Sequence, residues 1–247
     1  MNRLMTHIVV GNPTISKSKK FISEMIAREV AAIELQIPFS DPIADGPILM
    51  KANDVAVENG VSVEQVLNVL SEITPYKTKM CIMSYLQPIL SFGPSKFFDK
   101  ATELGCKGYI IPDLPFDSPD ALAFITKQPA LKNLIVPVLS TDMSITRISE
   151  LFEMLDPNLV YITARHGITG DRTVLDSEQL NSLIGHVRTL TNGKIAVGFG
   201  VQKSSDVKNI LKIADLAVVG SALTSALEQS ESVGIKLLAD LVNAAED

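Results

Sequence analysis

The sequence predicts an α/β fold, because apolar segments of strand length alternate along the chain with amphipathic segments of helical length. Strands that alternate with helices form parallel sheets, and eight such units in a chain of 247 residues match a closed (β/α)8 TIM barrel. An open doubly wound sheet is the alternative, but it more often has about five or six strands. No linker rich in Gly, Ser and Pro interrupts the sequence, so we expect residues 1–247 to form a single TIM-barrel domain.

The expected strands and helices follow one another in pairs along the chain. The eight expected strands are Ile8–Val10, Ile33–Ile37, Met80–Met83, Gly108–Ile111, Leu134–Leu139, Leu159–Thr163, Lys194–Val197 and Leu216–Val219. The expected helices are Ser16–Arg28, Ile48–Ile73, Pro94–Leu104, Ser118–Lys127, Ile145–Leu155, Ser177–Thr189, Ser205–Ile213 and Val233–Ala245. In a barrel of this kind, functional groups lie on the loops that follow the strands.

Composition excludes several classes of function. The net charge is −6, and no basic patch indicates a nucleic-acid partner. No apolar run has membrane-spanning length, and the start of the chain lacks a signal-peptide pattern. The two cysteines, Cys81 and Cys106, are too few for a disulfide framework or a zinc site, and the three histidines lack metal-ligand spacing. We therefore expect a cytoplasmic protein without a bound metal.

One expected strand carries a charge. Glu34 lies within an apolar run that Pro38 ends, and the loop that follows contains Asp41 and Asp45. A carboxylate in an apolar strand is costly unless it is paired, protonated or used in chemistry. Two carboxyl groups in different surroundings near one strand end are a common source of one acid and one base. Alternatively, Asp45 is a helix N-terminal residue and Asp41 caps a turn.

Glycines at the ends of the last two strands predict a phosphate site. Gly198 and Gly200 flank Phe199, and Gly220 and Ser221 open a short helical segment. Backbone N–H groups at glycines and at a helix N-terminus can approach phosphate oxygens closely. Tight packing between strands and helices is the other explanation for these glycines.

Two further features concern the barrel mouth. The polar segment 164–173 is either a lid that excludes water or a plain surface loop. Aromatic and sulfur-containing side chains near the strand ends either line a pocket for an aromatic ligand or belong to the core; they are Met83, Tyr85, Tyr161 and Phe199. His7 lies on the first strand and points toward the mouth, but we do not assign it a catalytic role.

The segment 33–47, IELQIPFSDPIADGP, resembles the signature of the tryptophan synthase alpha chain family. The resemblance continues in order along essentially the whole chain through VVGNP, SYLQP, PDLP, RHGITG, VGFG and VVGSAL. It implies a lyase that cleaves indole-3-glycerol phosphate into indole and glyceraldehyde 3-phosphate by a retro-aldol step. Glu34 matches the residue that protonates C3 of the indole ring and then helps remove the glycerol hydroxyl proton. Asp45 matches the residue that accepts a hydrogen bond from the indole N–H and stabilises the cationic indolenine.

The resemblance also implies roles for other residues. Tyr161 matches the residue that supports the second carboxylate, and Thr169 matches a lid residue that meets the loop of Asp45. The matched substrate-binding positions are Gly170, Phe199, Gly200, Gly220 and Ser221. No cofactor is implied for this chain. Pyridoxal phosphate is expected only in a beta subunit, which the chain joins through Asp41 and Asp113 in an alpha2-beta2 heterotetramer.

The chain departs from the family pattern at four positions. Gln36 replaces a glycine of the family pattern, and Asn12 replaces an aspartate. Gln87 replaces an asparagine, and His7 replaces an aromatic residue of the indole pocket. The segment before the first strand is also short. Two alternative functions follow from these differences: a low-activity alpha-like barrel that mainly activates a beta subunit, or a free-standing lyase that releases indole. Another phosphate-binding barrel, such as an isomerase, leaves the acidic loop unexplained.

Overall fold

The computed structural model describes residues 2–73, 77–116, 130–163, 177–198 and 200–246. Within these residues, parallel strands form one sheet in the order β5-β4-β3-β2-β1-β9-β8-β7-β6. The strands are β1 (Leu4–Val9), β2 (Ala32–Gln36), β3 (Lys79–Met83), β4 (Tyr109–Ile110), β5 (Ile135–Val136), β6 (Val138–Ser140), β7 (Leu159–Thr163), β8 (Lys194–Gly198) and β9 (Leu216–Val219). The order places the last strand beside the first, as a barrel requires, and confirms the predicted fold class.

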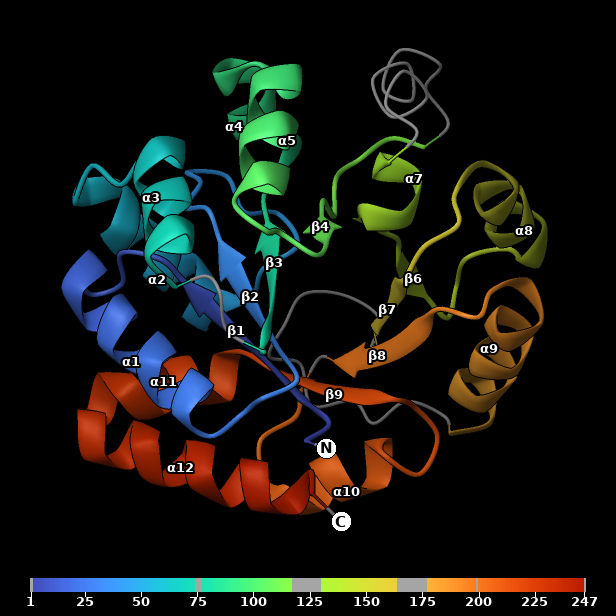
Figure 1. The fold of residues 1–247 in the computed structure, drawn as a ribbon. Helices are drawn as coiled ribbons and strands as arrows, with labels where there is room; N and C mark the ends of the chain where they lie inside the picture. Colours follow the sequence, from blue (N-terminus) through green and yellow to red (C-terminus); the bar gives the residue numbers. More distant parts are fainter. Residues whose placement is uncertain (1, 74–76, 117–129, 164–176, 199, 247) are drawn as a thin grey trace.

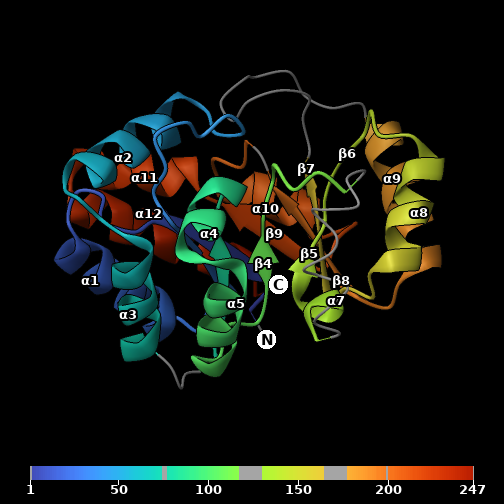
Figure 2. The same ribbon diagram turned by 90° about the horizontal axis from the view of Figure 1, so that it is seen from above.

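Helices surround the strands, as Figures 1 and 2 show from two directions. They are α1 (Ile15–Ala27), α2 (Pro47–Glu58), α3 (Val63–Ile73), α4 (Leu86–Phe92), α5 (Pro94–Glu103), α7 (Leu131–Leu134), α8 (Ile145–Met154), α9 (Ser177–Leu190), α10 (Ser204–Ile210), α11 (Ser221–Gln229) and α12 (Glu231–Ala244). No helix among the described residues is long and apolar enough to cross a membrane.

The alternation of side chains along β2 separates two apolar regions. Ile33 and Leu35 face outward into the core between the strands and the helices. Ala32 faces inward into a second cluster inside the barrel. Because side chains alternate along a strand, Glu34 and Gln36 share the inward side with Ala32. The charge in this strand is therefore directed into the barrel and not into the helical layer.

The expected strand Leu134–Leu139 is divided in the structure. β5 and β6 lie on either side of Pro137, which has no N–H group to donate to the sheet. The carbonyl of Pro137 still accepts a hydrogen bond from the backbone N–H of Tyr161, at 2.9 Å. β5 pairs with β4 and β6 pairs with β7, and β5 and β6 stand at opposite ends of the strand order. Pro137 therefore lies where the chain passes from one end of the sheet to the other.

The other differences from the expected elements are local. The expected helix Ile48–Ile73 is two helices, α2 and α3, separated at Gly60, which has a φ of 70°. The first strand begins at Leu4, four residues before its expected start. The short helices α4 and α7 were not predicted, because neither segment has a long amphipathic repeat. The expected helix Ser118–Lys127 lies outside the described residues.

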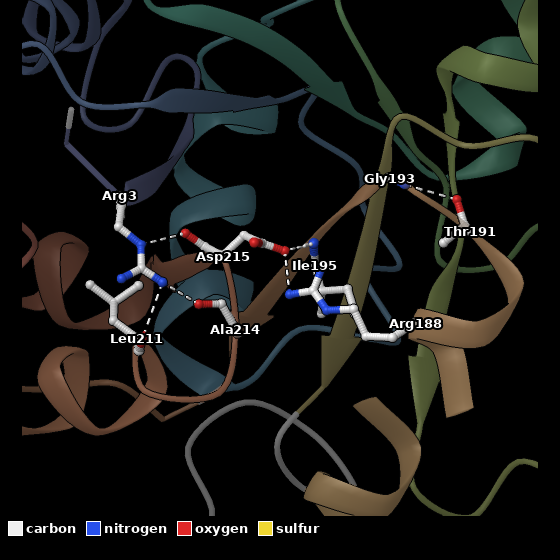
Figure 3. Close-up of polar contacts among 8 residues, drawn as sticks. All are labelled: Arg3, Arg188, Thr191, Gly193, Ile195, Leu211, Ala214 and Asp215. Carbon is white, nitrogen blue, oxygen red and sulfur yellow. Dashed lines mark hydrogen bonds and ion pairs between the residues drawn. The ribbon is translucent and has the colours of Figure 1, made fainter. Parts of the chain in front are cut away.

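A polar cluster joins the strands at the amino-terminal end of the barrel (Figure 3). The guanidinium group of Arg3 donates to the backbone carbonyls of Asp215, at 3.1 Å, and Leu211, at 3.0 Å. The carboxylate of Asp215 accepts from the backbone N–H of Ile195, at 2.7 Å, and forms an ion pair with Arg188, at 2.6 Å. One aspartate therefore connects the starts of β1, β8 and β9.

Candidate active site

Glu34 occupies the inner wall of the barrel. It lies on β2, beside His7 of β1 and Cys81 of β3 in the strand register, and is 5% exposed. No hydrogen bond or ion pair joins its carboxyl group to a described residue. Burial, and to a smaller extent the nearby charge of Asp45, raises the pKa of Glu34 to about 8. This carboxyl group therefore keeps its proton at neutral pH, as a general acid requires.

Asp45 has different surroundings, although it is also 5% exposed. It lies on the loop between β2 and α2, and its Oδ2 atom accepts three hydrogen bonds. The donors are Nε2 of Gln36 at 2.7 Å, Oη of Tyr85 at 3.2 Å and Nδ2 of Asn53 at 3.3 Å. Burial raises the pKa of Asp45, whereas the three donors lower it. The two carboxyl groups thus differ in one respect: among the described residues, only Asp45 has donors that favour its charged form.

The donors around Asp45 are themselves fixed by the backbone. Asn53 accepts from the backbone N–H of Phe39 at 3.1 Å and donates to the carbonyl of Leu49 at 2.9 Å. The hydroxyl of Tyr85 accepts from the backbone N–H of Ala44 at 3.0 Å. Sequence analysis assigned no role to Asn53, although a polar residue on the buried face of α2 was a usable signal.

The predicted phosphate residues lie beside the carboxyl groups. Gly200, Gly220 and Ser221 line the same cavity as Glu34 and Asp45. Gly200 follows β8 with a φ of 82°, a conformation that favours glycine. Gly220 precedes the first residue of α11, where backbone N–H groups have no partner within the helix. Phe199, Thr169 and Gly170 lie outside the described residues.

Gly220 also makes room for a side chain. A Cβ atom at this position would lie 3.0 Å from Nδ1 of His7 and 3.2 Å from its Cβ. The absence of a side chain at Gly220 therefore allows the imidazole ring to pack against the start of α11. Sequence analysis considered only the approach of phosphate to this glycine.

Tyr161 of β7 lines the cavity and is 8% exposed. A side chain at Gly198 would collide with its hydroxyl group, so this glycine makes room for the tyrosine. Burial raises the pKa of Tyr161, and the charges of Glu34 and Asp45 act in the same direction. The resemblance gave Tyr161 the task of supporting Asp45, which stays a prediction; Tyr85 also donates to Asp45, at 3.2 Å.

The two predicted partner residues lie on loops that follow β2 and β4. Asp41 is exposed, and the hydroxyl of Ser40 donates to its Oδ2 at 2.6 Å. Asp113 accepts from the backbone N–H of Leu86 at 2.9 Å and so fixes the start of α4. Ile43, on the same loop as Asp41, is 73% exposed.

The four departures from the family pattern separate into two groups. His7 and Gln36 are buried and joined by a hydrogen bond of 2.8 Å between Nε2 and Oε1. Asn12 and Gln87 do not line the cavity. Among the described residues, no three His, Cys, Asp or Glu side chains are placed to hold a metal ion.

The fold and the cavity define a (β/α)8 barrel in which two buried carboxyl groups face the ends of β8 and β9. The model of the tryptophan synthase alpha chain family matches residues 1–246, and the chain belongs to this family.

Individual relatives agree with this assignment. The alpha chain of Desulfotalea psychrophila is 34% identical over 222 residues, which are 88% of this chain and 85% of that protein. The alpha chain of Syntrophotalea carbinolica is 35% identical over 228 residues, 92% of this chain and 88% of that protein.

Solved structures are similar over nearly the whole chain. The structure of Mycobacterium tuberculosis tryptophan synthase has a TM-score of 0.86 at 25% identity and covers 99% of this chain and 92% of that chain. Tryptophan synthase subunit alpha from Campylobacter jejuni has a TM-score of 0.83 at 29% identity, with 97% of this chain and 95% of that chain covered.

Proposed function

We propose that Glu34 and Asp45 of this chain cleave indole-3-glycerol phosphate into indole and glyceraldehyde 3-phosphate. As a member of its family, the chain is a carbon–carbon lyase with the alpha-subunit function in tryptophan biosynthesis. The observation that supports the residue assignment is the contrast between two buried carboxyl groups at one strand end. Asp45 accepts three hydrogen bonds, and the carboxyl group of Glu34 has none from a described residue.

The first step is protonation of the indole ring. The bond between the ring and the glycerol chain breaks only when C3 of the ring can accept the bonding electrons. Glu34, whose pKa is raised to about 8, holds a proton at neutral pH and transfers it to C3. The products of this step are a cationic indolenine and the carboxylate form of Glu34.

Asp45 stabilises the cation that this step creates. Its Oδ2 atom is occupied by the three donors, and we assign its other carboxylate oxygen to the indole N–H. The positive charge of the indolenine is concentrated near that nitrogen, so a fixed carboxylate lowers the energy of the intermediate.

Cleavage then returns the proton to Glu34. The carboxylate of Glu34 removes the proton from the hydroxyl group on the carbon attached to the ring. The carbon–oxygen double bond of the aldehyde forms, the bond to C3 breaks, and its electrons neutralise the indolenine. Indole and glyceraldehyde 3-phosphate leave, and Glu34 regains the form in which it began.

The cavity supplies the remaining contacts in this proposal. The phosphate lies over Gly200, Gly220 and the backbone N–H of Ser221, at the start of α11. Apolar side chains of the cavity enclose the indole ring; they include Met83, Ile110, Val138, Tyr161 and Val218. The roles of Phe199, Thr169 and Gly170 in binding the substrate rest on the resemblance alone.

The beta subunit is the proposed partner. Asp41 and Asp113 lie on loops that follow β2 and β4, and the exposed Ile43 provides apolar surface beside Asp41. Docking at this face would pass indole directly to a second active site, where pyridoxal phosphate is bound in the beta subunit. We assign no cofactor to this chain. We also propose that it forms an alpha2-beta2 assembly and lies in the cytoplasm.

Release of indole from indole-3-glycerol phosphate tests the proposal. Purified native protein is assayed alone and with a beta chain, beside Glu34→Gln and Asp45→Asn. Loss of the general acid in Glu34→Gln is expected to lower turnover by ~10²–10⁴-fold with the fold retained. Asp41→Ala is the matched control, and should lose activity stimulated by the partner more than basal activity. Near-native turnover in Glu34→Gln would exclude it as the acid.

A further inference from the structure

One buried nitrogen atom of His7 has no hydrogen-bond partner among the described residues. Its side chain lies next to Glu34 in the register of β1 and β2, is 6% exposed, and lines the active-site cavity. Nε2 is bonded to Gln36, whereas Nδ1 has no hydrogen-bond partner among the described residues. Buried polar atoms of side chains nearly always have a partner, so an unpartnered buried atom on a residue that lines the active site points to a partner that a ligand supplies.

The orientation of Gln36 follows from the backbone. The N–H of Phe39 can only donate, so the atom of Asn53 that it meets is the acceptor Oδ1. The amide nitrogen of Gln36 lies 3.4 Å from this Oδ1 and 2.7 Å from Oδ2 of Asp45. Both neighbours accept hydrogen bonds, so Gln36 directs its NH₂ group toward them. Its oxygen atom is thereby turned toward His7.

This orientation fixes the tautomer of His7. The oxygen of Gln36 only accepts, so Nε2 of His7 carries the hydrogen of their 2.8 Å bond. Burial lowers the pKa of His7 to about 4, so the ring is neutral near pH 7 and carries one N–H. Nδ1 therefore carries a lone pair that requires a hydrogen-bond donor.

The position of Nδ1 identifies which part of the substrate can donate. His7 pairs with Glu34 in the strand register, and its Nδ1 would lie 3.0 Å from a Cβ added at Gly220. The proposed reaction places the ring near Glu34 and the phosphate near Gly220. The carbon chain between ring and phosphate carries two hydroxyl groups. A phosphate dianion, by contrast, has no hydrogen to donate and would repel the lone pair.

We propose that Nδ1 of His7 accepts a hydrogen bond from a hydroxyl group of the glycerol chain, and that Gln36 holds the ring in the tautomer that allows this. His7 is then a specificity-determining residue, which favours the hydroxylated phosphate ester over an analogue without hydroxyl groups. The inference rests on the proposed function. It also explains two departures from the family pattern, His7 and Gln36, as one bonded pair.

Two ligands measure this preference. One is indole-3-glycerol phosphate, and the other is 3-(indol-3-yl)propyl phosphate, in which hydrogen replaces both hydroxyl groups. Binding is measured in Glu34→Gln, so that the substrate is not consumed. The chain contains no tryptophan, so the fluorescence of the ligand's indole ring reports binding without a background from protein tryptophan. The measured quantity is the ratio of the two dissociation constants.

A matched pair of variants isolates the Nδ1 atom. In His7→Asn, the amide oxygen can occupy the position of Nδ1, because both atoms are attached to Cγ. In His7→Gln, a polar group reaches toward Gln36 but no acceptor replaces Nδ1. We expect His7→Gln to reduce the preference for the hydroxylated ligand by about threefold to tenfold. His7→Asn should retain most of the preference, and thermal unfolding verifies that both variants fold.

Each contrary result has a distinct meaning. An unchanged ratio in His7→Gln would overturn the inference. An equal loss of affinity for both ligands would show that His7 acts by packing or on the phosphate, and would overturn it as well. If the native protein does not cleave indole-3-glycerol phosphate, and Glu34→Gln with native His7 binds neither ligand, the proposed function fails. This inference then fails with it. Cleavage by the native protein together with an unchanged ratio separates the two failures.

Discussion

The two ends of the barrel contain cavities of opposite character. The cavity at the amino-terminal end has a volume of about 370 Å³, and the active-site cavity at the carboxyl end has about 70 Å³. Exposed lysines surround it, namely Lys77, Lys79, Lys107 and Lys194, and none forms an ion pair with a described residue. In the active-site cavity at the carboxyl end, the carboxyl groups of Glu34 and Asp45 and the imidazole of His7 are all buried. Removal from water, and not the size of the cavity, makes these groups chemically useful.

The ends also differ in what they contribute to stability. Glu34 is buried and has no donor among the described residues, so its charged form is disfavoured in the folded state and its burial opposes folding at neutral pH. At the other end, Arg3 and Asp215 satisfy several backbone groups and close the barrel (Figure 3). The barrel thus separates a stabilising end from a functional end, as this fold commonly does. Substitutions at the two ends should therefore have opposite effects.

Of the substitutions that test this comparison, Glu34→Gln should have the largest effect. It should raise the free energy of unfolding. The unfolded state releases the Glu34 proton near pH 4.5, and the folded state releases it near pH 8. Between these values the folded state binds more protons, so native stability falls as pH rises through this window. The amide removes this loss. At pH 7 the gain in the free energy of unfolding is expected to be on the order of 3 kcal/mol.

Chemical denaturation at pH 5 and pH 7 measures the gain. It should be several times smaller at pH 5, close to the lower limit of the window. The exposed Asp41→Asn serves as the control, since it changes a carboxyl group that is not buried. An equal gain at both pH values would show that the folded protein does not protonate Glu34.

The dependence of activity on pH tests the contrast between the two carboxyl groups. Activity should fall above about pH 8, where Glu34 loses its proton, and on the acidic side where Asp45 gains one. Tyr85→Phe removes one donor that favours the charged form of Asp45. The acidic limb of the kcat/KM profile should move to higher pH by about one unit, while the basic limb stays in place. Equal movement of both limbs would contradict separate roles.

The success of the sequence prediction depended on how local each signal was. The barrel follows from repeated short patterns, and Glu34 was found because one charge interrupts an apolar strand. The structure places Glu34, Asp45, Gly200 and Gly220 around one cavity, as those patterns indicated. Each of these residues was identified from its immediate neighbours in the chain.

The supporting contacts could not be predicted, because they join distant positions. Tyr85 meets Asp45 across 40 residues, and His7 meets Gln36 across 29. Sequence analysis identified both His7 and Gln36 as departures, but their bond depends on strand register and on the space left by Gly220. Pro137 was a local signal that the strand prediction ignored, although a missing N–H predicts a break in a strand.

Asp215→Asn should weaken the stabilising end. The substitution removes the ion pair with Arg188 and weakens the hydrogen bond from the backbone of Ile195. Both side chains of the ion pair are partly exposed, so solvent reduces its contribution. The free energy of unfolding should fall by about 1–2 kcal/mol, with kcat/KM unchanged. A loss of activity at a temperature where the variant is folded would show that the two ends are coupled.

The smallest expected effect concerns the lysines around the amino-terminal cavity. Lys79 and Lys194 begin β3 and β8, and both side chains are exposed. In Lys79→Gln combined with Lys194→Gln, the free energy of unfolding should change by less than about 0.5 kcal/mol, as is usual for exposed positions. Like charges around one opening repel each other, so any increase in the free energy of unfolding should appear at low ionic strength and vanish in high salt.

Because no lysine of this group reaches the reacting atoms, kcat/KM for indole-3-glycerol phosphate should stay within about twofold of native. A larger fall, with the fold intact by thermal unfolding, would mean that the charge at this end influences the buried carboxyl groups through the barrel interior.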